Sequence, residues 1–265
     1  MELFDSHCHL DDKTFLKDLA GVIDRANRAG VTLMTTIGVD RGTSIRAVQI
    51  AESTPGVYAT VGFHPHDARF CTEAALEELV QLAGRDSVRA WGEIGLDFNR
   101  MHSPRTVQET WFVRQIDISE QLALPVVFHE RDSGGRLIEI LKSDFSPGRT
   151  GVVHCFSGTA DELQAYLDLG LFIGVTGIVT MKERGAPLRR LVSRIPDDRL
   201  LIETDAPYLV PAPERNRIRR NEPAFVVSVL EKLAAVRKNT IVHLAKTTRQ
   251  NACRLFGIDE GPENR

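Results

Sequence analysis

Short apolar runs rich in β-branched residues return about every thirty residues along this chain, and they constrain its fold more than any other feature. Between the runs, apolar side chains recur with helical spacing, as at Phe15, Leu19 and Val22. The eight runs cover residues 2–7, 31–38, 57–63, 88–96, 125–129, 151–156, 172–179 and 200–205. Repeated strand–helix units predict an α/β fold with a parallel sheet buried on both faces. We therefore expect a (β/α)8 TIM barrel, and no GxGxxG motif follows the first run to favour a doubly wound open sheet.

The length of 265 residues suits one barrel, since barrels of about 250 residues form single domains. After the eighth run we expect a long loop over 207–222, a helix over 225–236 and an additional C-terminal helix over 240–256. No linker, low-complexity stretch or second domain is apparent. The sequence predicts a single domain over residues 1–265.

Composition favours a protein of a reducing compartment. The four cysteines form no CxxC pair, the first apolar run starts without a preceding basic segment, and no apolar stretch approaches the length of a membrane span. The net charge of −3 gives no global field that attracts nucleic acid, so any such contact must come from a local patch. We expect a cytoplasmic protein without a membrane segment, and no protein partner is predicted.

Candidate metal ligands lie at the C-terminal ends of the apolar runs. They are His7, His9, Glu93, His129, His154 and Asp205. Imidazoles and carboxylates bind divalent metals, and active sites of β/α barrels lie at the C-terminal ends of the strands. One such residue alone is more often an ordinary hydrogen-bonded polar group, but recurrence on successive strands favours metal. We expect two divalent ions that share a hydroxide, with Mg, Mn and Zn among the candidates and their identity left open.

Candidate substrate contacts occur at the same ends of the strands. His64 and His66 follow the third run in GFHPHD, and Arg131 lies two residues after His129, on the same side of its strand. The segment 214–223 contains the only dense basic cluster, in a position where barrels often bind phosphate. Within it, Arg220 is the preferred contact, because guanidinium groups hold phosphate oxygens bidentately. A solvated loop is the alternative for the other arginines.

Eight motifs occur in a fixed order: SHCHL, GFHPHD, GEIGLDFNR, HERD, VHCFSG, GVTGIVT, LLIETDAPYL and RRNEP. Through these motifs the sequence resembles the TatD family of metal-dependent deoxyribonucleases, and the likeness covers nearly the whole chain. The resemblance implies an amidohydrolase-like barrel with Mg- or Mn-stimulated nuclease activity on DNA, including 3′–5′ exonuclease action on single strands.

The resemblance also implies a role for each ligand. His7 and His9 would bind the first metal, Glu93 would bridge the two ions, and His129 and His154 would bind the second. Asp205 would lie at the first metal beside the catalytic water. The motif HERD departs from the family where Glu130 replaces a smaller residue; by strand alternation it should point away from the site.

Hydrolysis of a phosphodiester is the favoured chemistry. In this hypothesis Asp205 orients the attacking water and takes its proton, and Glu203 supports it or serves as a further base. His64, Arg131 and Arg220 would hold the non-bridging oxygens, His66 would contact substrate, and a histidine would protonate the leaving oxygen. DNA is the expected substrate, with RNA, the polarity of digestion and the oligomeric state left open.

The sequence leaves three alternatives to a nuclease. The same barrel carries small-molecule amidohydrolases and esterases, although Glu93 stands where many of them place a carboxylated lysine. A D-aminoacyl-tRNA deacylase would use the same water and metals. A non-enzymatic nucleic-acid binder that keeps metals for stability is disfavoured, because structural sites are usually closed by four ligands of one ion.

Overall fold

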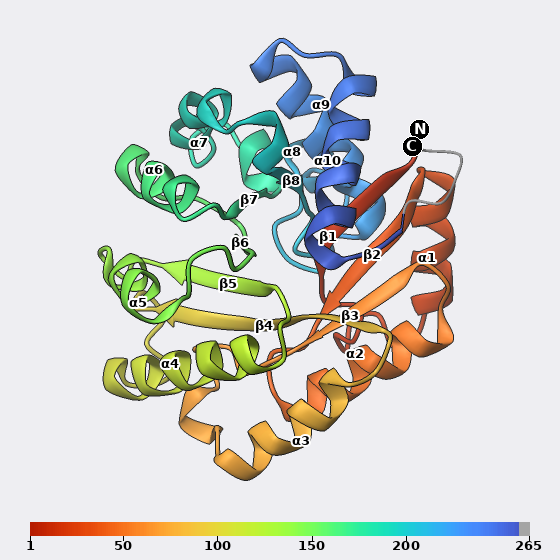
Figure 1. Ribbon diagram of the computed structural model, residues 1–265. Coiled ribbons are helices and arrows are strands. Elements are labelled where there is room, and N and C mark those ends of the chain that lie inside the picture. The colour runs from red at the N-terminus through yellow and green to blue at the C-terminus, as the bar shows by residue number, and fades with distance from the viewer. Residues whose placement is uncertain (260–265) are drawn as a thin grey trace. The chain divides into compact units, whose positions relative to one another are not determined.

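The structure is a computed structural model and describes residues 1–259 (Figure 1). One eight-stranded sheet has its strands in the order in which they occur along the chain. The strands are β1 (Leu3–Cys8), β2 (Val31–Ile37), β3 (Val57–Val61), β4 (Val88–Asp97), β5 (Val126–Arg131), β6 (Gly151–Val153), β7 (Phe172–Val175) and β8 (Leu200–Ile202). The order and repeated strand–helix units are those of a (β/α)8 barrel, so the predicted fold class is confirmed.

Helices follow the strands along the chain, and the additional C-terminal helix is present. They are α1 (Leu19–Arg28), α2 (Arg41–Ser53), α3 (Glu73–Ala83), α4 (Arg105–Gln121), α5 (Arg136–Asp144), α6 (Ala160–Asp168), α7 (Ala186–Leu191), α8 (Ala212–Arg215), α9 (Val226–Arg237) and α10 (Ile241–Phe256). Short 3-10 helices are η1 (Ala68–Phe70), η2 (Gly177–Thr180), η3 (Val192–Arg194), η4 (Asp197–Arg199) and η5 (Pro223–Phe225).

All eight predicted strands exist, but the last three end earlier than the apolar runs suggested. After β7 the side chain of Thr176 accepts a hydrogen bond from the backbone N of Ile178 and starts η2. A Cβ on Gly177 would lie 2.5 Å from the carbonyl oxygen of Leu209, so only glycine fits this close approach. The apolar run 172–179 therefore divides between a strand and a buried turn.

Contacts within the chain define two compact units. The first contains residues 1–35, 155–157 and the chain from 173 onward, and the second contains residues 36–154 and 158–172. The single domain predicted over residues 1–265 is not tested by this division and stays a prediction.

In the first unit, α10 packs on β1 and β8. The rings of Phe4 and Phe256 lie 5.7 Å apart, and both side chains are buried. The side-chain amide of Asn251 donates to the carbonyl oxygen of Leu200 at 2.9 Å, which fixes α10 against β8. The helix starts at its N-cap Thr240 and ends at Gly257, whose φ of 61° is the left-handed conformation common at helix ends.

In the second unit, α2, α3 and α4 lie against β3 and β4 (Figure 1). The core contains the rings of Phe112, Phe128 and Phe145, with neighbouring centroids 6.1 and 5.4 Å apart. Strands β4 and β5 approach closely at Gly95, where a Cβ would lie 2.0 Å from the carbonyl oxygen of His129. This close approach brings the C-terminal halves of β4 and β5 together, where Glu93 and His129 lie.

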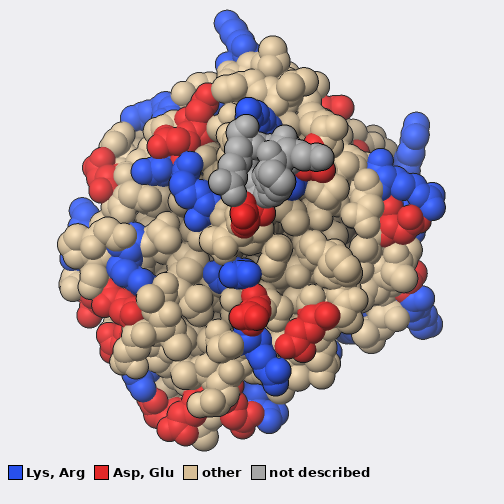
Figure 2. Space-filling model, turned by 45° about the vertical axis from the view of Figure 1, so that its right-hand side comes forward, with Lys and Arg blue, Asp and Glu red and all other residues tan. Residues whose placement is uncertain are grey.

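The surface carries charges of both signs. Basic and acidic side chains are interspersed over the face in Figure 2. Among the residues that the structure describes, no helix combines the length and the apolar character needed to cross a membrane.

Arg220, predicted to contact substrate, lies in an ion-pair cluster of the first unit. Its guanidinium donates to both oxygens of Asp18, at 2.8 and 2.7 Å, and to Glu222 at 2.8 Å. Arg25 donates to the second oxygen of Glu222 at 2.6 Å, and the Arg220 guanidinium also lies over the ring of Phe15. The cluster ties α1 to the segment before η5. The substrate contact of Arg220 stays a prediction.

We expect this cluster to weaken in acid. The hydrogen bond from Arg220, with Arg25 acting in the same direction, lowers the pKa of Asp18 to about 2 from its ordinary value of 3.8. A carboxyl group with a lowered folded-state pKa stabilises the fold above its unfolded pKa, and this contribution disappears as the pH falls toward 2. The variant Asp18→Asn should therefore lose less of its Tm than the unsubstituted protein between about pH 5 and about pH 2. Thermal melts across this range, with the exposed Asp117→Asn as control, test it; equal Tm losses would contradict it.

Candidate metal centre

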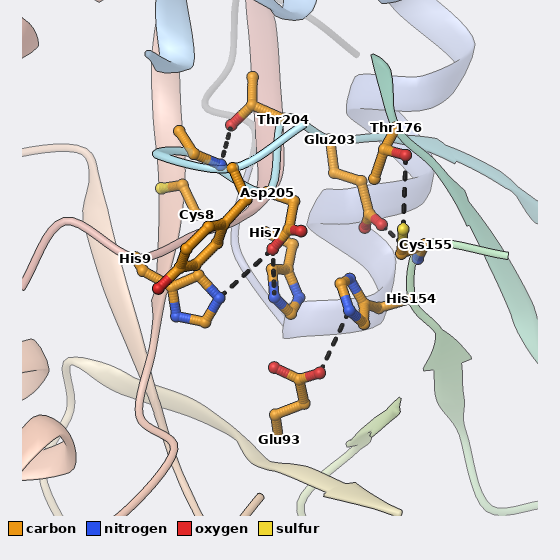
Figure 3. A network of polar contacts seen from close by, with 12 residues as sticks. His7, Cys8, His9, Glu93, His154, Cys155, Thr176, Glu203, Thr204 and Asp205 are labelled. Atoms are coloured by element: carbon orange, nitrogen blue, oxygen red, sulfur yellow. Dashed lines mark hydrogen bonds and ion pairs between the residues drawn. The ribbon is translucent and has the colours of Figure 1, made fainter. Parts of the chain in front are cut away.

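In the second unit, three histidines converge on one buried carboxylate oxygen of β4. Oε1 of Glu93 lies 2.7 Å from Nδ1 of His129, 3.1 Å from Nε2 of His154 and 3.5 Å from Nε2 of His64. Glu93 is only 2% exposed. The contact between Glu93 and His154 is drawn in Figure 3. Because a buried carboxylate is costly without compensating partners, these imidazoles are what stabilises its charge.

The carboxylates around His129 determine its protonation. Burial alone would lower the pKa of His129, but Asp97 and Glu93 outweigh burial and the net pKa is raised. Nε2 of His129 lies 3.4 Å from Asp97, on the opposite side of the ring from Glu93. A metal-bound histidine usually donates its other ring nitrogen to an oxygen such as that of a carboxylate, and Asp97 lies where it could accept from His129.

His64 is a neutral imidazole with a defined tautomer. Burial, with the neighbouring His129 acting in the same direction, lowers its pKa to about 3. Its Nδ1 accepts a hydrogen bond from the backbone N of His66 at 3.0 Å, so the ring proton lies on Nε2. That nitrogen is the one nearest to Glu93, so the predicted site residue His64 is indeed beside this candidate ligand.

His66 is oriented by Asp97. Nε2 of His66 lies 2.6 Å from Oδ2 of Asp97, and the other oxygen of Asp97 accepts from the backbone N of Asn99 and of Arg100, at 3.0 and 2.7 Å. Burial opposes ionisation, but the hydrogen bonds from His129, from His66 and from Arg100 hold the pKa of Asp97 below its usual range. Asp97 thus remains a carboxylate and aligns two predicted site histidines.

In the first unit, His7 and His9 point at Asp205, as Figure 3 shows. Nε2 of His9 lies 3.4 Å and Nε2 of His7 lies 3.7 Å from the same carboxylate oxygen. The side chain of Asp205 is 14% exposed, and that of His9 12%. The carboxylate of Asp205 is therefore less deeply buried than that of Glu93, whose side chain is 2% exposed.

Asp205 lies beyond the end of β8, in a turn. Its φ is 57°, its backbone N donates to the carbonyl oxygen of His7 at 2.9 Å, and Tyr208 N donates back to its carbonyl oxygen at 2.8 Å. The direction of its side chain is therefore set by the turn. Strand alternation does not apply at this position.

Asp5 supports that turn from within β1. Its two oxygens accept from the backbone N and the hydroxyl of Thr204, at 2.8 and 2.5 Å. Burial raises the pKa of Asp5 to about 8, and Thr204 opposes that rise. Because Thr204 immediately precedes Asp205, Asp5 fixes the backbone that carries the predicted catalytic carboxylate.

Glu203, predicted to be catalytic, holds the segment after β6. Its Oε1 accepts from the backbone N of Cys155 at 2.5 Å, and its Oε2 accepts from the hydroxyl of Ser6 at 3.3 Å. A Cβ on Gly174 would lie 2.4 Å from this carboxylate, so the buried side chain needs glycine on β7. These contacts favour the supporting role over that of a second base.

Glu130 and Arg131 are the last two residues of β5. Arg131, predicted to contact substrate, ends the strand and is half-buried; its predicted contact stays a prediction. Glu130 accepts a hydrogen bond from the backbone N of Ser133 at 2.9 Å, so its carboxylate is held in the turn after the strand.

The chemistry of the donor set in the second unit fits a divalent metal. Ligand atoms of Glu93, His129 and His154 lie within 4.8 Å of one another, and these residues lie on or directly after β4, β5 and β6. His64, His66 and His129 form a second group within the same limit. Imidazole nitrogens and a carboxylate oxygen gathered at this spacing suit Zn or Mn.

Sequence analysis missed two positioning residues, Asp5 and Asp97. Both carry a recognisable signal. Asp5 is an acidic residue that follows the apolar pair Leu3 and Phe4 within the first strand, two positions before His7 and therefore on its side. Asp97 shares the side of Glu93 and Gly95 by the same alternation.

Known proteins share this chain's sequence and fold over almost its full length. The model of the family described as TatD related DNase matches residues 4–257. The 3′–5′ ssDNA/RNA exonuclease TatD of Musicola paradisiaca (strain Ech703) is 42% identical over 264 residues, covering 98% of this chain and 100% of that protein. The uncharacterized metal-dependent hydrolase YabD of Bacillus subtilis (strain 168) is 37% identical and covers 97% of this chain and 100% of its own.

A solved structure agrees. The crystal structure of YJJV, a TatD homolog from Escherichia coli K12, has a TM-score of 0.90 and 30% sequence identity, and the match covers 97% of this chain and 98% of that one. The resemblance carried by the eight motifs is thereby confirmed, and the chain belongs to the TatD family.

Proposed function

We propose that this protein is a divalent-metal-dependent nuclease that hydrolyses phosphodiester bonds of DNA, with 3′–5′ exonuclease action on single strands. The observation that carries the proposal is the convergence of His129 and His154 on Glu93, at 2.7 and 3.1 Å. Relatives named as 3′–5′ ssDNA/RNA exonucleases, about as long as this chain, support the substrate class and keep RNA within it.

The proposed metal ligands are those predicted from the sequence. In the second unit, Glu93, His129 and His154 would hold one ion. In the first unit, His7, His9 and Asp205 would supply ligands for another. The roles of the two ions, the bridging role of Glu93 and the metal identity stay predictions.

When bound, divalent metal would lower the pKa of a coordinated water and neutralise charge on the phosphoryl oxygens. Asp205 is the proposed base. Its carboxylate is oriented by the turn that contains Thr204 and Asp205, and its side chain remains partly exposed. Glu203 would keep the backbone at Cys155 in place.

His66 is the proposed donor to the leaving oxygen. The side chain of His66 is 31% exposed and is paired with Asp97, whereas His64 is buried and neutral. A carboxylate-paired imidazole can both donate and regain a proton, and this pairing supports His66 over His64 in that role. His64 would instead contact substrate or ligand as a neutral donor through Nε2.

The choice between a phosphodiester and another ester or amide needs a direct assay. Labelled single-stranded DNA, duplex DNA, RNA, an aminoacyl-tRNA and a simple phosphodiester would be offered with Mn, with Mg and with EDTA. The proposal expects EDTA-sensitive shortening of single strands from the 3′ end. Exclusive hydrolysis of the aminoacyl ester, or binding without turnover, would contradict it.

Asp205→Asn should abolish turnover. Loss of a general base costs about 100-fold or more in kcat, while the backbone hydrogen bonds from Thr204 to Asp5 and from Asp205 to His7 remain. Initial rates on labelled single-stranded DNA measure the effect, and far-UV circular dichroism checks the fold. The exposed Asp117→Asn on α4 is the control and should keep its rate. Undiminished turnover of Asp205→Asn would remove the assignment.

Glu93→Gln should weaken metal binding in the second unit. The amide cannot supply the negative oxygen on which the histidines converge, so we expect a loss of Mn affinity of about tenfold or more. Titration followed by electron paramagnetic resonance of free Mn reports affinity independently of activity. Glu77→Gln, at an exposed position of α3, serves as the control, and equal affinities of the two variants would count against Glu93 as a ligand.

A further inference from the structure

Two segments of the first unit concentrate positive charge: residues 182–194, called the first loop below, and residues 214–220, called the second loop. Residues 182–194 contain five basic residues and one acidic residue, and residues 214–220 contain four basic residues and one acidic residue. The sequence prediction recognised only the second group. The first follows β7 and η2, and the second follows β8.

The two loops are neighbours in the folded unit. The backbone N of Ala212 donates to the hydroxyl of Thr180 at 2.8 Å. The guanidinium of Arg215 lies 3.8 Å from the sulfur of Met181. Positive charge that is separated by about thirty positions in sequence therefore shares one surface.

Four of these cations lack acidic partners. Lys182, Arg184, Arg217 and Arg219 are exposed, and none forms an ion pair with a carboxylate within residues 1–259. We call these four residues the basic surface. Exposed arginines elsewhere are commonly paired, for example Arg41 with Glu78, Arg114 with Glu73 and Arg136 with Glu109. Uncompensated cations gathered on one surface favour a polyanion.

Glu214, the acidic residue of the second loop, is hydrogen-bonded within the protein. Glu214 accepts from the hydroxyl of Ser228 at 2.5 Å and is half-buried. The first loop is held by Arg189, which donates to the carbonyl oxygens of Val179, Met181 and Lys182 at 2.9, 2.6 and 2.6 Å. The backbone that carries Lys182 is therefore fixed before any ligand arrives.

An exposed aromatic ring lies beside these loops. Tyr208 is 54% exposed, and its ring lies 5.7 Å from the ring of the candidate ligand His9. The side-chain amide of Asn221 donates to its carbonyl oxygen at 2.6 Å and so joins Tyr208 to the end of the second loop. Exposed aromatic rings next to cations are typical of proteins that bind single-stranded nucleic acid, where bases stack and phosphates are neutralised.

We propose that the basic surface binds the phosphates of single-stranded nucleic acid, and that Tyr208 stacks on a base next to His9. This inference rests on the proposed function and extends it from the reacting phosphate to the flanking strand. It predicts binding without sequence preference, because phosphate contacts carry no base information. Duplex DNA should bind less well, since its bases are not available to Tyr208.

The test uses full-length protein carrying Asp205→Asn, so that the strand is bound without being consumed. Anisotropy of a fluorescein-labelled 20-nucleotide oligothymidylate gives Kd over a range of salt concentrations. For each phosphate that a variant no longer neutralises, the slope of log Kd against log salt should fall by about 0.7. Both Lys182→Gln with Arg184→Gln and Arg217→Gln with Arg219→Gln should therefore lower the slope by about 1.4.

Matched controls separate position from total charge. Lys142→Gln with Lys246→Gln removes two exposed cations from α5 and α10 and should leave the slope unchanged. Tyr208→Ala should weaken binding of the single strand at least about fivefold while keeping the salt slope. Equal slopes in the loop variants and in the control pair, or tighter binding of a 20-base-pair duplex than of the single strand, would overturn the inference.

A failure of the proposed nuclease activity can be told apart from a failure of the basic-surface inference. In the background with Asp205 intact, a thymidine dinucleotide is too short to need the basic surface, so the loop variants should cleave it at the unsubstituted rate. No EDTA-sensitive cleavage in any variant would refute the nuclease, whereas normal cleavage with unchanged strand affinity would refute only the basic surface.

Discussion

A single buried oxygen of Glu93 meets three imidazoles, and most of the candidate centre of the second unit is arranged around it. Removing a carboxylate from water is expensive unless hydrogen bonds and nearby charges compensate it. The neighbouring residues are placed accordingly. Burial keeps His64 neutral, and Asp97 holds the far side of His129. A buried carboxylate surrounded by imidazoles is the donor set expected of a divalent-metal site, which is the role proposed for it.

The fold and the grouping of the candidate ligands within each unit were largely predictable, because both depend on short-range rules. Apolar runs separated by helical spacing identify strands of a parallel sheet, and the carboxyl ends of those strands lie at one edge. His7, Glu93 and His154 could be recognised from that rule alone, since each ends or follows an apolar run. The early end of β7 was not predicted, because apolar residues also fill the buried turn that Thr176 starts.

The interactions that the sequence did not predict are long-range ones. Asp5 acts through Thr204, 199 positions away, and Glu203 acts through Cys155, 48 positions away. Period-two alternation assigns a side of a strand, but it cannot tell which loop a carboxylate will hold. The same limit explains Lys182 and Arg184: their segment and the one that follows β8 are about thirty positions apart, and they form one patch only because the chain packs them side by side.

Arg189 gives the loop after η2 a property that its sequence does not suggest. With three backbone carbonyls bound by one guanidinium, the loop loses little conformational freedom when a ligand associates. Association then restricts mainly the rotamers of the outer side chains. If single-stranded nucleic acid binds there as proposed, it would associate and dissociate with little reordering of the backbone.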